Sequence, residues 1–131
     1  MANVQYGYDK NLGNVGFDDA VARVTAALKQ EGFGVLTEID VKGTLKQKIG
    51  VDIDEYKILG ACNPKLAHQA LQSQPEVGLL LPCNVVVRST DQGTVVHLAS
   101  PKAMFAFIDD PKVAPVATEA DARIRRVLEA L

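Results

Sequence analysis

Tryptophan is absent from this sequence of 131 residues, and only 5% of its residues are aromatic. The hydrophobic interior must therefore be built mainly from Val, Leu, Ile and Ala, with four phenylalanines as the largest apolar side chains. The sequence also lacks an apolar run of about 18 residues, the length that a membrane-spanning helix needs. Residues 1–10 show neither the basic stretch nor the apolar segment of a secretory leader. We therefore expect a cytoplasmic protein that has no membrane partner.

The sequence also lacks a large net charge of either sign. The 14 basic and 16 acidic side chains give a formal net charge of -2, which creates no long-range field to attract nucleic acid or anionic lipid. The two cysteines are expected to be free thiols, because disulfides are rare in a reducing compartment. Hydrophobic residues make up 47% and charged residues 23%, as in ordinary globular chains, and the length suits one domain over residues 1–131.

The first half of the chain shows alternating strand and helix patterns. A short strand is expected around residues 6–9, where two tyrosines alternate with small or polar residues. Apolar residues then recur at spacings of three and four over residues 17–31, which predicts an amphipathic helix that ends at Gly32. The β-branched run 33–41 predicts a strand, and we expect it to pair with the first strand.

The middle of the chain has clear helix start and stop signals. A small amphipathic helix with several lysines is expected over residues 41–49, and Gly50 closes it. The run 56–62 predicts a strand. Asn63 and Pro64 then supply a helix cap and a favoured first helical residue.

An apolar run over residues 77–87, a turn over residues 90–93 and a second apolar run predict a β-hairpin. Pairing Ser89 with Thr94 sorts the side chains of this hairpin by polarity, whereas a slip of one residue would mix them. One face then carries Val85, Val87, Val96 and Leu98, and the other carries Asn84, Arg88 and His97.

The last third of the chain predicts two further helices. Ser100 and Pro101 form a cap and first turn for a short helix. Residues 111–115 contain two prolines and are expected to lack regular structure. Thr118 and Asp121 resemble a capping box at the start of the final helix. The complete order, β, α, β, α, β, α, β, β, α, α, predicts an α+β fold with one mainly antiparallel sheet covered by helices.

Three segments of the sequence resemble a known family. They are 32–41 (GFGVLTEIDV), 56–64 (YKILGACNP) and 79–87 (LLLPCNVVV), which together resemble the bacterial and archaeal domain of unknown function 302 family. The resemblance covers residues 17–131. It implies a curved antiparallel sheet backed by helices, similar to the β-α-β architecture of TATA-binding protein, and assembly as a homodimer. The family has no established activity, so the resemblance implies no reaction and no cofactor.

The two cysteines each precede an asparagine, and each Cys-Asn pair belongs to a strand-like run. An asparagine amide can donate and accept hydrogen bonds but does not titrate, so paired asparagines suit ligand orientation better than catalysis. A glutamate and an aspartate two residues apart, on one face of the strand 33–41, add carboxylates. The candidate ligand-binding residues are Cys62, Asn63, Cys83, Asn84 and Glu38.

An alternative hypothesis assigns chemistry to the thiols. Cys62, His68, Cys83 and His97 are residue types that bind soft or borderline metals. The predicted hairpin register places Cys83 and His97 on opposite faces, which is against one four-ligand site and therefore predicts no metal site of this kind. The alternative is then a metal-handling or redox protein that depends on Cys62 and Cys83.

The sequence contains no recognised catalytic motif. A Ser-His-Asp set could be composed from Ser89 or Ser100, His97 and Asp91, but no nucleophile-elbow glycines surround either serine. The glycines fit no phosphate-binding loop, and no cofactor is identified. We therefore expect a non-enzymatic, homodimeric module that binds a small ligand or a protein partner, with thiol chemistry as the alternative.

Overall fold

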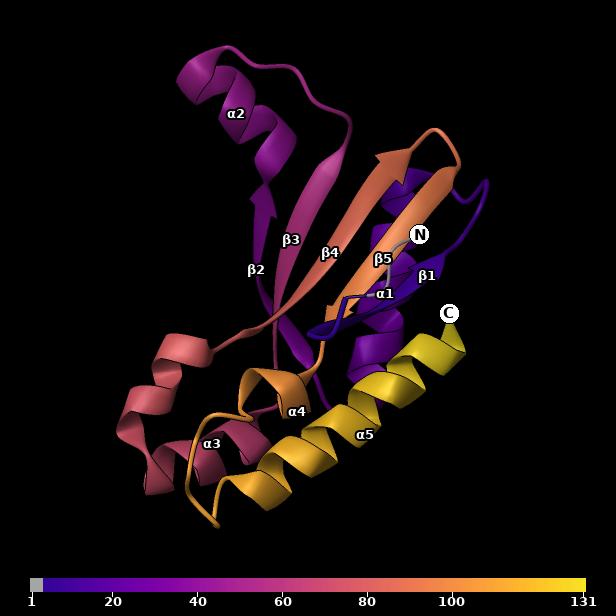
Figure 1. Cartoon of the computed structure of the whole chain (residues 1–131). Helices are drawn as coiled ribbons and strands as arrows, with labels where there is room; N and C mark the ends of the chain where they lie inside the picture. Colours follow the sequence, from indigo (N-terminus) through magenta and orange to yellow (C-terminus); the bar gives the residue numbers. More distant parts are fainter. Residues whose placement is uncertain (1–3) are drawn as a thin grey trace.

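The structure is a computed structural model that describes residues 4–131 (Figure 1). Strands and helices alternate along most of this part of the chain. Their order is β1 (Gly7–Asn11), α1 (Phe17–Gln30), β2 (Gly34–Asp40), α2 (Val41–Ile49), β3 (Tyr56–Cys62), α3 (Pro64–Ser73), the 3-10 helix η1 (Pro75–Leu80), β4 (Cys83–Thr90), β5 (Gly93–Ala99), α4 (Pro101–Met104) and α5 (Ala114–Ala130).

The strands form one sheet in the order β1-β5-β4-β3-β2, and every neighbouring pair is antiparallel. The α+β class with a mainly antiparallel sheet is thereby confirmed. The expected pairing of the first two strands is wrong, because β1 pairs with β5 at one edge and β2 pairs with β3 at the other. The intervening helix α1 carries the chain across the sheet, so strands that are consecutive in sequence lie at opposite edges.

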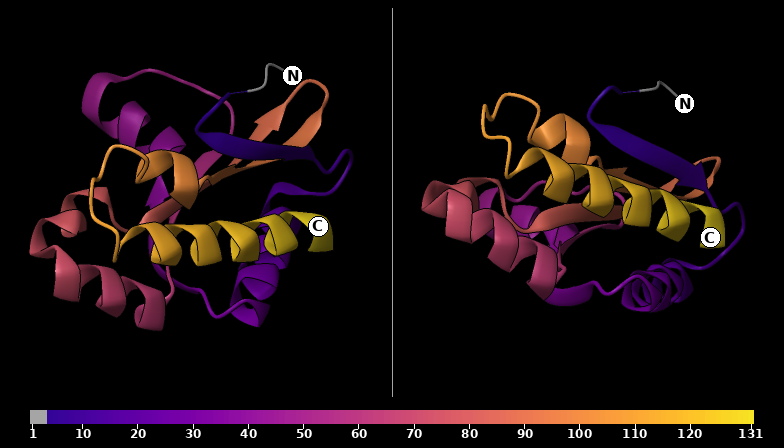
Figure 2. Two further views of the ribbon diagram at one scale, coloured as in Figure 1. Left: turned by 60° about the horizontal axis from the view of Figure 1, so that its bottom comes forward. Right: turned by 90° about the horizontal axis from the view of Figure 1, so that it is seen from below.

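One face of the sheet packs against α1 and α5. The buried residues of this core are aliphatic or alanine apart from one phenylalanine, as the composition predicts: Ala20, Val24, Ala27, Leu28, Phe33, Leu59, Ala61, Val85, Val87, Val96, Leu98, Ile124 and Val127. Figure 2 shows α5 running from the α3 end of the molecule towards β1. The core therefore lies between this sheet face and the two long helices.

A second apolar cluster lies beyond one end of the sheet, where α3, η1 and α4 meet the start of α5. Its buried residues are Ala70, Val77, Phe105, Val113, Val116 and Ala117. Figure 1 shows α3 and η1 at this end and α2 at the opposite end. The second cluster positions η1 and α4 beside the sheet face that α1 and α5 leave open.

The predicted helix starts are correct where the signal is a capping residue followed directly by proline. The Asn63 side chain accepts a hydrogen bond from the Leu66 backbone N–H at 3.2 Å, and Pro64 is the first residue of α3. Ser100 likewise accepts from the Ala103 N–H at 3.2 Å and begins α4. The hairpin register is also confirmed, since Ser89 lies opposite Thr94 in β4 and β5.

The start of the last helix was predicted wrongly. Helix α5 begins at Ala114, so part of the segment 111–115 is helical and the proposed capping box lies inside the helix. Asp121 is 3% exposed and accepts hydrogen bonds from the hydroxyls of Tyr8 and Ser100, both at 2.6 Å. A buried carboxylate that accepts bonds from other elements serves tertiary packing, and its spacing from Thr118 is coincidental.

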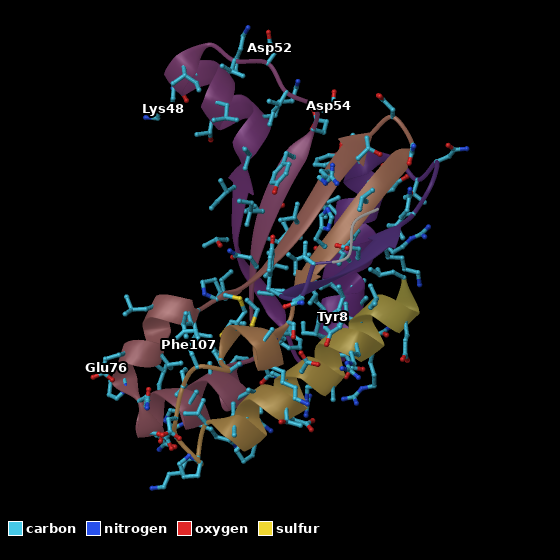
Figure 3. The ribbon with its side chains drawn as sticks, in the orientation of Figure 1. Tyr8, Lys48, Asp52, Asp54, Glu76 and Phe107 are labelled. Atoms are coloured by element: carbon cyan, nitrogen blue, oxygen red, sulfur yellow. The ribbon has the colours of Figure 1, made fainter. Side chains whose placement is uncertain are left out.

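Helix α2 projects from the end of β2 (Figure 1) and contains no buried residue. Asp40 caps it by accepting from the Gly43 N–H at 3.0 Å, and Gly50 ends it in a left-handed conformation, φ 69°. Figure 3 shows Lys48 and Asp52 at the tip of this projection, far from Glu76 and Phe107. Within residues 4–131, every helix falls short of the length and hydrophobicity needed to cross a membrane.

Candidate functional site

A pocket of about 650 Å³ lies on the open face of the sheet. Its floor comes from β1, β5 and β4, and one wall comes from η1, the segment that follows it, and α4. The wall is apolar and includes Leu80, Leu81, Pro101, Met104 and Phe105. Known ligand sites are commonly about 300–1,000 Å³ with mostly apolar walls and a few polar groups, so this pocket has the size and character of a small-molecule site.

Three charged or titratable side chains form a chain of contacts in the pocket. His97 of β5 lies opposite Asp9 of β1, and its Nδ1 contacts the Asp9 carboxylate. Arg88 of β4 donates from Nε to His97 Nε2 at 2.9 Å. Because Nε2 accepts this bond, the hydrogen-bond network assigns the ring proton to Nδ1, which donates to Asp9. The side chains of Asp9 and His97 are 10% and 27% exposed, so this pair is largely held within the protein.

Additional polar groups line the same pocket. Tyr56 of β3 lies opposite Arg88 in the sheet register, and Asn84 lies at the exposed start of β4. Tyr6, just before β1, is 63% exposed at the pocket. Hydroxyl and amide groups at these positions can orient a ligand without changing their charge.

The structure brings some of the predicted site residues together. Cys83 and Asn84 line the large pocket, whereas Cys62, Asn63 and Cys83 line a second, smaller pocket of about 30 Å³. Cys83 lies opposite Ala61, the residue before Cys62, so the two cysteines are neighbours on adjacent strands. Both cysteines are free thiols. The smaller pocket has room for little more than one water molecule, which makes the larger pocket the better ligand site.

Asn63 and Glu38 have partners of their own. Asn63 caps α3 and donates from its amide to the Glu31 carbonyl at 3.4 Å. Glu38 forms an ion pair with Lys57 at 3.5 Å, and neither of the two pockets includes it among its lining residues. The carboxylate of Asp40 is used in capping α2. The paired carboxylates therefore have structural partners rather than a shared ligand position.

The environment of the thiols suppresses the thiolate. Partial burial raises the pKa of Cys62, and burial together with the proximity of Cys62 raises the pKa of Cys83 to about 11. Reactive and metal-binding cysteines need a stabilised thiolate, which these surroundings do not supply. Among residues 4–131, no three His, Cys, Asp or Glu side chains gather closely enough to hold a metal ion, so the two thiols have no third ligand.

Sequence reasoning did not identify Asp9, Tyr56, Arg88 and His97 as members of one site. The hairpin register did place Arg88 and His97 on one polar face, and that was the available signal. Asp9 joins them only through the pairing of β1 with β5, which the sequence analysis did not foresee.

Comparisons with known proteins bear on the whole chain. A family model for the domain of unknown function DUF302 matches residues 8–131. The fold is similar to the crystal structure of an uncharacterized conserved protein DUF302 from Bacillus stearothermophilus, with a TM-score of 0.87 and 30% sequence identity. That similarity covers 97% of this chain and 98% of the other. A comparison with curated proteins finds no match.

Proposed function

We propose that this chain, which belongs to the domain of unknown function DUF302 family as its three motifs predicted, binds a small, largely apolar molecule in its pocket. The observation that carries this proposal is the pocket of about 650 Å³ between the open sheet face, η1 and α4. Its apolar wall would supply affinity, and its few polar groups would supply orientation. We further propose, from its exposed edge strand, that it assembles as a homodimer.

The state of the polar groups supports binding rather than catalysis. Both ring nitrogens of His97 are engaged, one with Asp9 and the other with Arg88, so the imidazole is not free to accept a proton from a substrate. The pocket thiol, Cys83, has a pKa of about 11 and is therefore a weak nucleophile at neutral pH. The same raised pKa counts against the alternative of a thiol-dependent metal or redox protein.

Exposed apolar side chains on β2 and α2 support the proposed homodimer. Leu36, Ile39 and Ile49 are 67%, 48% and 66% exposed, and β2 is an edge strand. An exposed edge with apolar side chains is a favourable surface for pairing with another chain. We propose that a second copy covers this surface.

Ligand binding can be tested on untagged protein purified under reducing conditions. Native mass spectrometry, compared with the denatured mass, would reveal a non-metal adduct of defined stoichiometry. The protein freed of any adduct is then titrated with 1-octanol while backbone amides are followed by NMR, and amides of β4 and β5 beside the pocket should shift. Val86→Trp, which fills the pocket from β4, should abolish these shifts, whereas Leu71→Trp on α3 should retain them. Shifts confined to other regions would contradict the proposal.

The dimer is tested separately by sedimentation velocity. The wild-type protein should sediment as a dimer, and Ile39→Lys should produce a monomer because a charge at a buried interface is costly. Phe107→Lys provides the control, since Phe107 is 73% exposed and lies at the opposite end of the molecule from α2 (Figure 3). A wild-type monomer, or a dimer that both variants retain, would remove this part of the proposal.

A further inference from the structure

The residues of the pocket also indicate the chemical class of its ligand, an inference that rests on the proposed binding function. From the geometry of Arg88 we propose that the ligand is an amphiphile with an anionic carboxylate or phosphate group, and that Arg88 binds this group. His97 and Asp9 act as positioning residues for Arg88 and do not contact the ligand's anionic group themselves.

A guanidinium group carries five N–H donors, and Arg88 uses the one on Nε to reach His97. The four donors on its two terminal nitrogens have no hydrogen-bond or ion-pair partner among the residues that the structure describes. These two nitrogens form the planar fork that matches a carboxylate or phosphate. Since Arg88 lines the pocket, the fork is accessible to a bound molecule.

The contacts behind Arg88 hold its side chain in place. His97 accepts from Nε, and the opposite ring nitrogen is held by the Asp9 carboxylate. Asp9, His97 and Arg88 come from β1, β5 and β4, three consecutive strands of the sheet, so the arrangement is anchored in regular backbone. A long side chain that is already ordered loses less conformational entropy when it binds a ligand.

The charges favour an anion over a cation. The Asp9 carboxylate is 10% exposed and faces His97, whereas Arg88 forms no ion pair within residues 4–131. The guanidinium therefore attracts an anionic group, whereas the Asp9 carboxylate, which also lines the pocket, is already engaged by His97 Nδ1. Tyr56 and Asn84 line the same pocket and offer further neutral donors.

The apolar wall determines the remainder of the ligand. Leu80, Leu81, Met104 and Phe105 belong to the η1 and α4 side of the pocket, next to the polar floor. An inorganic anion would leave this wall unused, and a hydrocarbon would leave the arginine fork unused. A molecule with one anionic end and one aliphatic or aromatic end uses both, because burial of apolar surface and a charge-assisted hydrogen bond then both favour binding.

The test repeats the NMR titration with four probes. Octanoate, 1-octanol and octylamine have the same chain length and differ in their polar group, and inorganic phosphate has no apolar part. Octanoate should bind in the pocket about 10-fold more tightly than 1-octanol, since hydrogen bonds to charged groups are worth about this factor or more. Inorganic phosphate and octylamine should both bind more weakly than octanoate. Binding of inorganic phosphate as tight as that of octanoate would indicate a site for a free anion. Weaker binding of phosphate indicates that the ligand also needs an apolar part.

Variants of the protein test which residues produce the preference for octanoate over 1-octanol. Arg88→Met should reduce the octanoate affinity about 10-fold, to that of 1-octanol, and leave 1-octanol unchanged. His97→Phe and Asp9→Asn should reduce the ratio of octanoate to 1-octanol affinity by a smaller factor, whereas a merely structural role would weaken both probes together. Arg23→Met, which changes an exposed arginine on α1, is the charge control.

The outcomes separate the two proposals. If octanoate and 1-octanol bind in the pocket equally well, or if Arg88→Met keeps the preference for octanoate, the anionic ligand is refuted and the binding function stands. Preferential binding of octylamine would also refute it. If none of the probes shifts the pocket amides of the wild-type protein, the binding function and the inference that rests on it are both overturned.

Discussion

Asp121 is the buried centre of a polar network that joins three parts of the fold. Its Oδ2 accepts from the Tyr8 hydroxyl at 2.6 Å, and its Oδ1 accepts from the Ser100 hydroxyl at 2.6 Å and from the Lys102 backbone N–H at 3.2 Å. Arg125 Nε lies 3.2 Å from Oδ2. Figure 3 shows Tyr8 beside α5, the helix that carries Asp121. Asp121→Ala would leave these donors without their common acceptor.

The cost of Asp121→Ala can be estimated from the contacts. Removing the common acceptor should cost about 2–4 kcal/mol, because the Ser100 hydroxyl and the Lys102 N–H stay desolvated, whereas the side chain of Arg125 is 61% exposed and remains hydrated. For a chain of this length, such a loss corresponds to a fall in Tm of about 7–15 °C. We expect these values for Asp121→Ala in urea unfolding followed by circular dichroism and in thermal unfolding.

A matched control lies on the same helix. Glu119 forms an exposed pair with Arg123 at 2.9 Å, so Glu119→Ala should change the free energy of unfolding by less than about 0.5 kcal/mol. A double-mutant cycle adds Tyr8→Phe, which should cost clearly less in the Asp121→Ala protein than in the wild type. A loss below about 1 kcal/mol for Asp121→Ala, or additive costs in the cycle, would refute the assigned role of the network.

The same carboxylate gives a pH dependence with a defined sign. Burial alone acts to raise the pKa of Asp121, but the hydrogen bonds from Ser100 and Tyr8 and the charge of Arg125 outweigh it and hold the pKa below its ordinary value of 3.8. A depressed pKa in the folded state stabilises the protein fully above the unfolded-state pKa, and this contribution is lost as pH falls through the folded-state value. The stability difference between the wild type and Asp121→Ala should therefore narrow from pH 7 to pH 3. A constant difference would show that the charge of Asp121 is not involved.

Two further predictions concern the hairpin turn and the thiols. Gly93 has φ +128°, and a Cβ there would lie 2.6 Å from Asn11 Oδ1, so Gly93→Ala should cost about 2 kcal/mol or more in urea unfolding. Gly34→Ala, where nothing lies within 4 Å, should be neutral or gain up to about 1 kcal/mol, and equal effects of both would contradict the argument. Because the pKa of Cys83 is raised from 9.0 to about 11, its thiolate fraction at neutral pH is about 100-fold lower, and iodoacetamide should alkylate it correspondingly more slowly in the folded protein than in urea. Peptide mapping should show the folded-state rate rising up to about pH 11, and a plateau near pH 9 would be inconsistent with the burial of this thiol.

The parts of the fold that the sequence predicted correctly depend on contacts between near neighbours. Asn63 and Ser100 cap helices through backbone groups three residues ahead, and the hairpin joins Ser89 to Thr94 across a short turn. The hairpin could be predicted in detail because alternation fixes which residues share a face, so only one register separates apolar from polar side chains. Local sequence contains the information for each of these features.

The errors involve contacts between residues that are far apart in sequence. Tyr8 and Asp121 are 113 residues apart and belong to a strand and a helix that meet only in the folded protein. From sequence alone, an aspartate three residues after a threonine is equally compatible with a capping box, and the buried hydrogen bonds that decide the matter are not visible. The start of α5 is a different kind of error, because its signal is local: residues 111–115 were expected to lack regular structure, whereas Pro115 lies in the first turn of the helix, where proline is tolerated.

The candidate site shows why a search for motifs could not find it. Asp9, His97, Arg88 and Tyr56 come from β1, β5, β4 and β3, so they follow the order of strands in the sheet and not the order of the chain. A site on one face of an antiparallel sheet needs only one residue from each strand, and its members can be separated by any number of residues. The strand registers are therefore the information that identifies it. With β1 paired to β2, as the sequence suggested, Asp9 would lie at the far edge of the sheet from His97, and Arg88 would be held by an imidazole without its carboxylate.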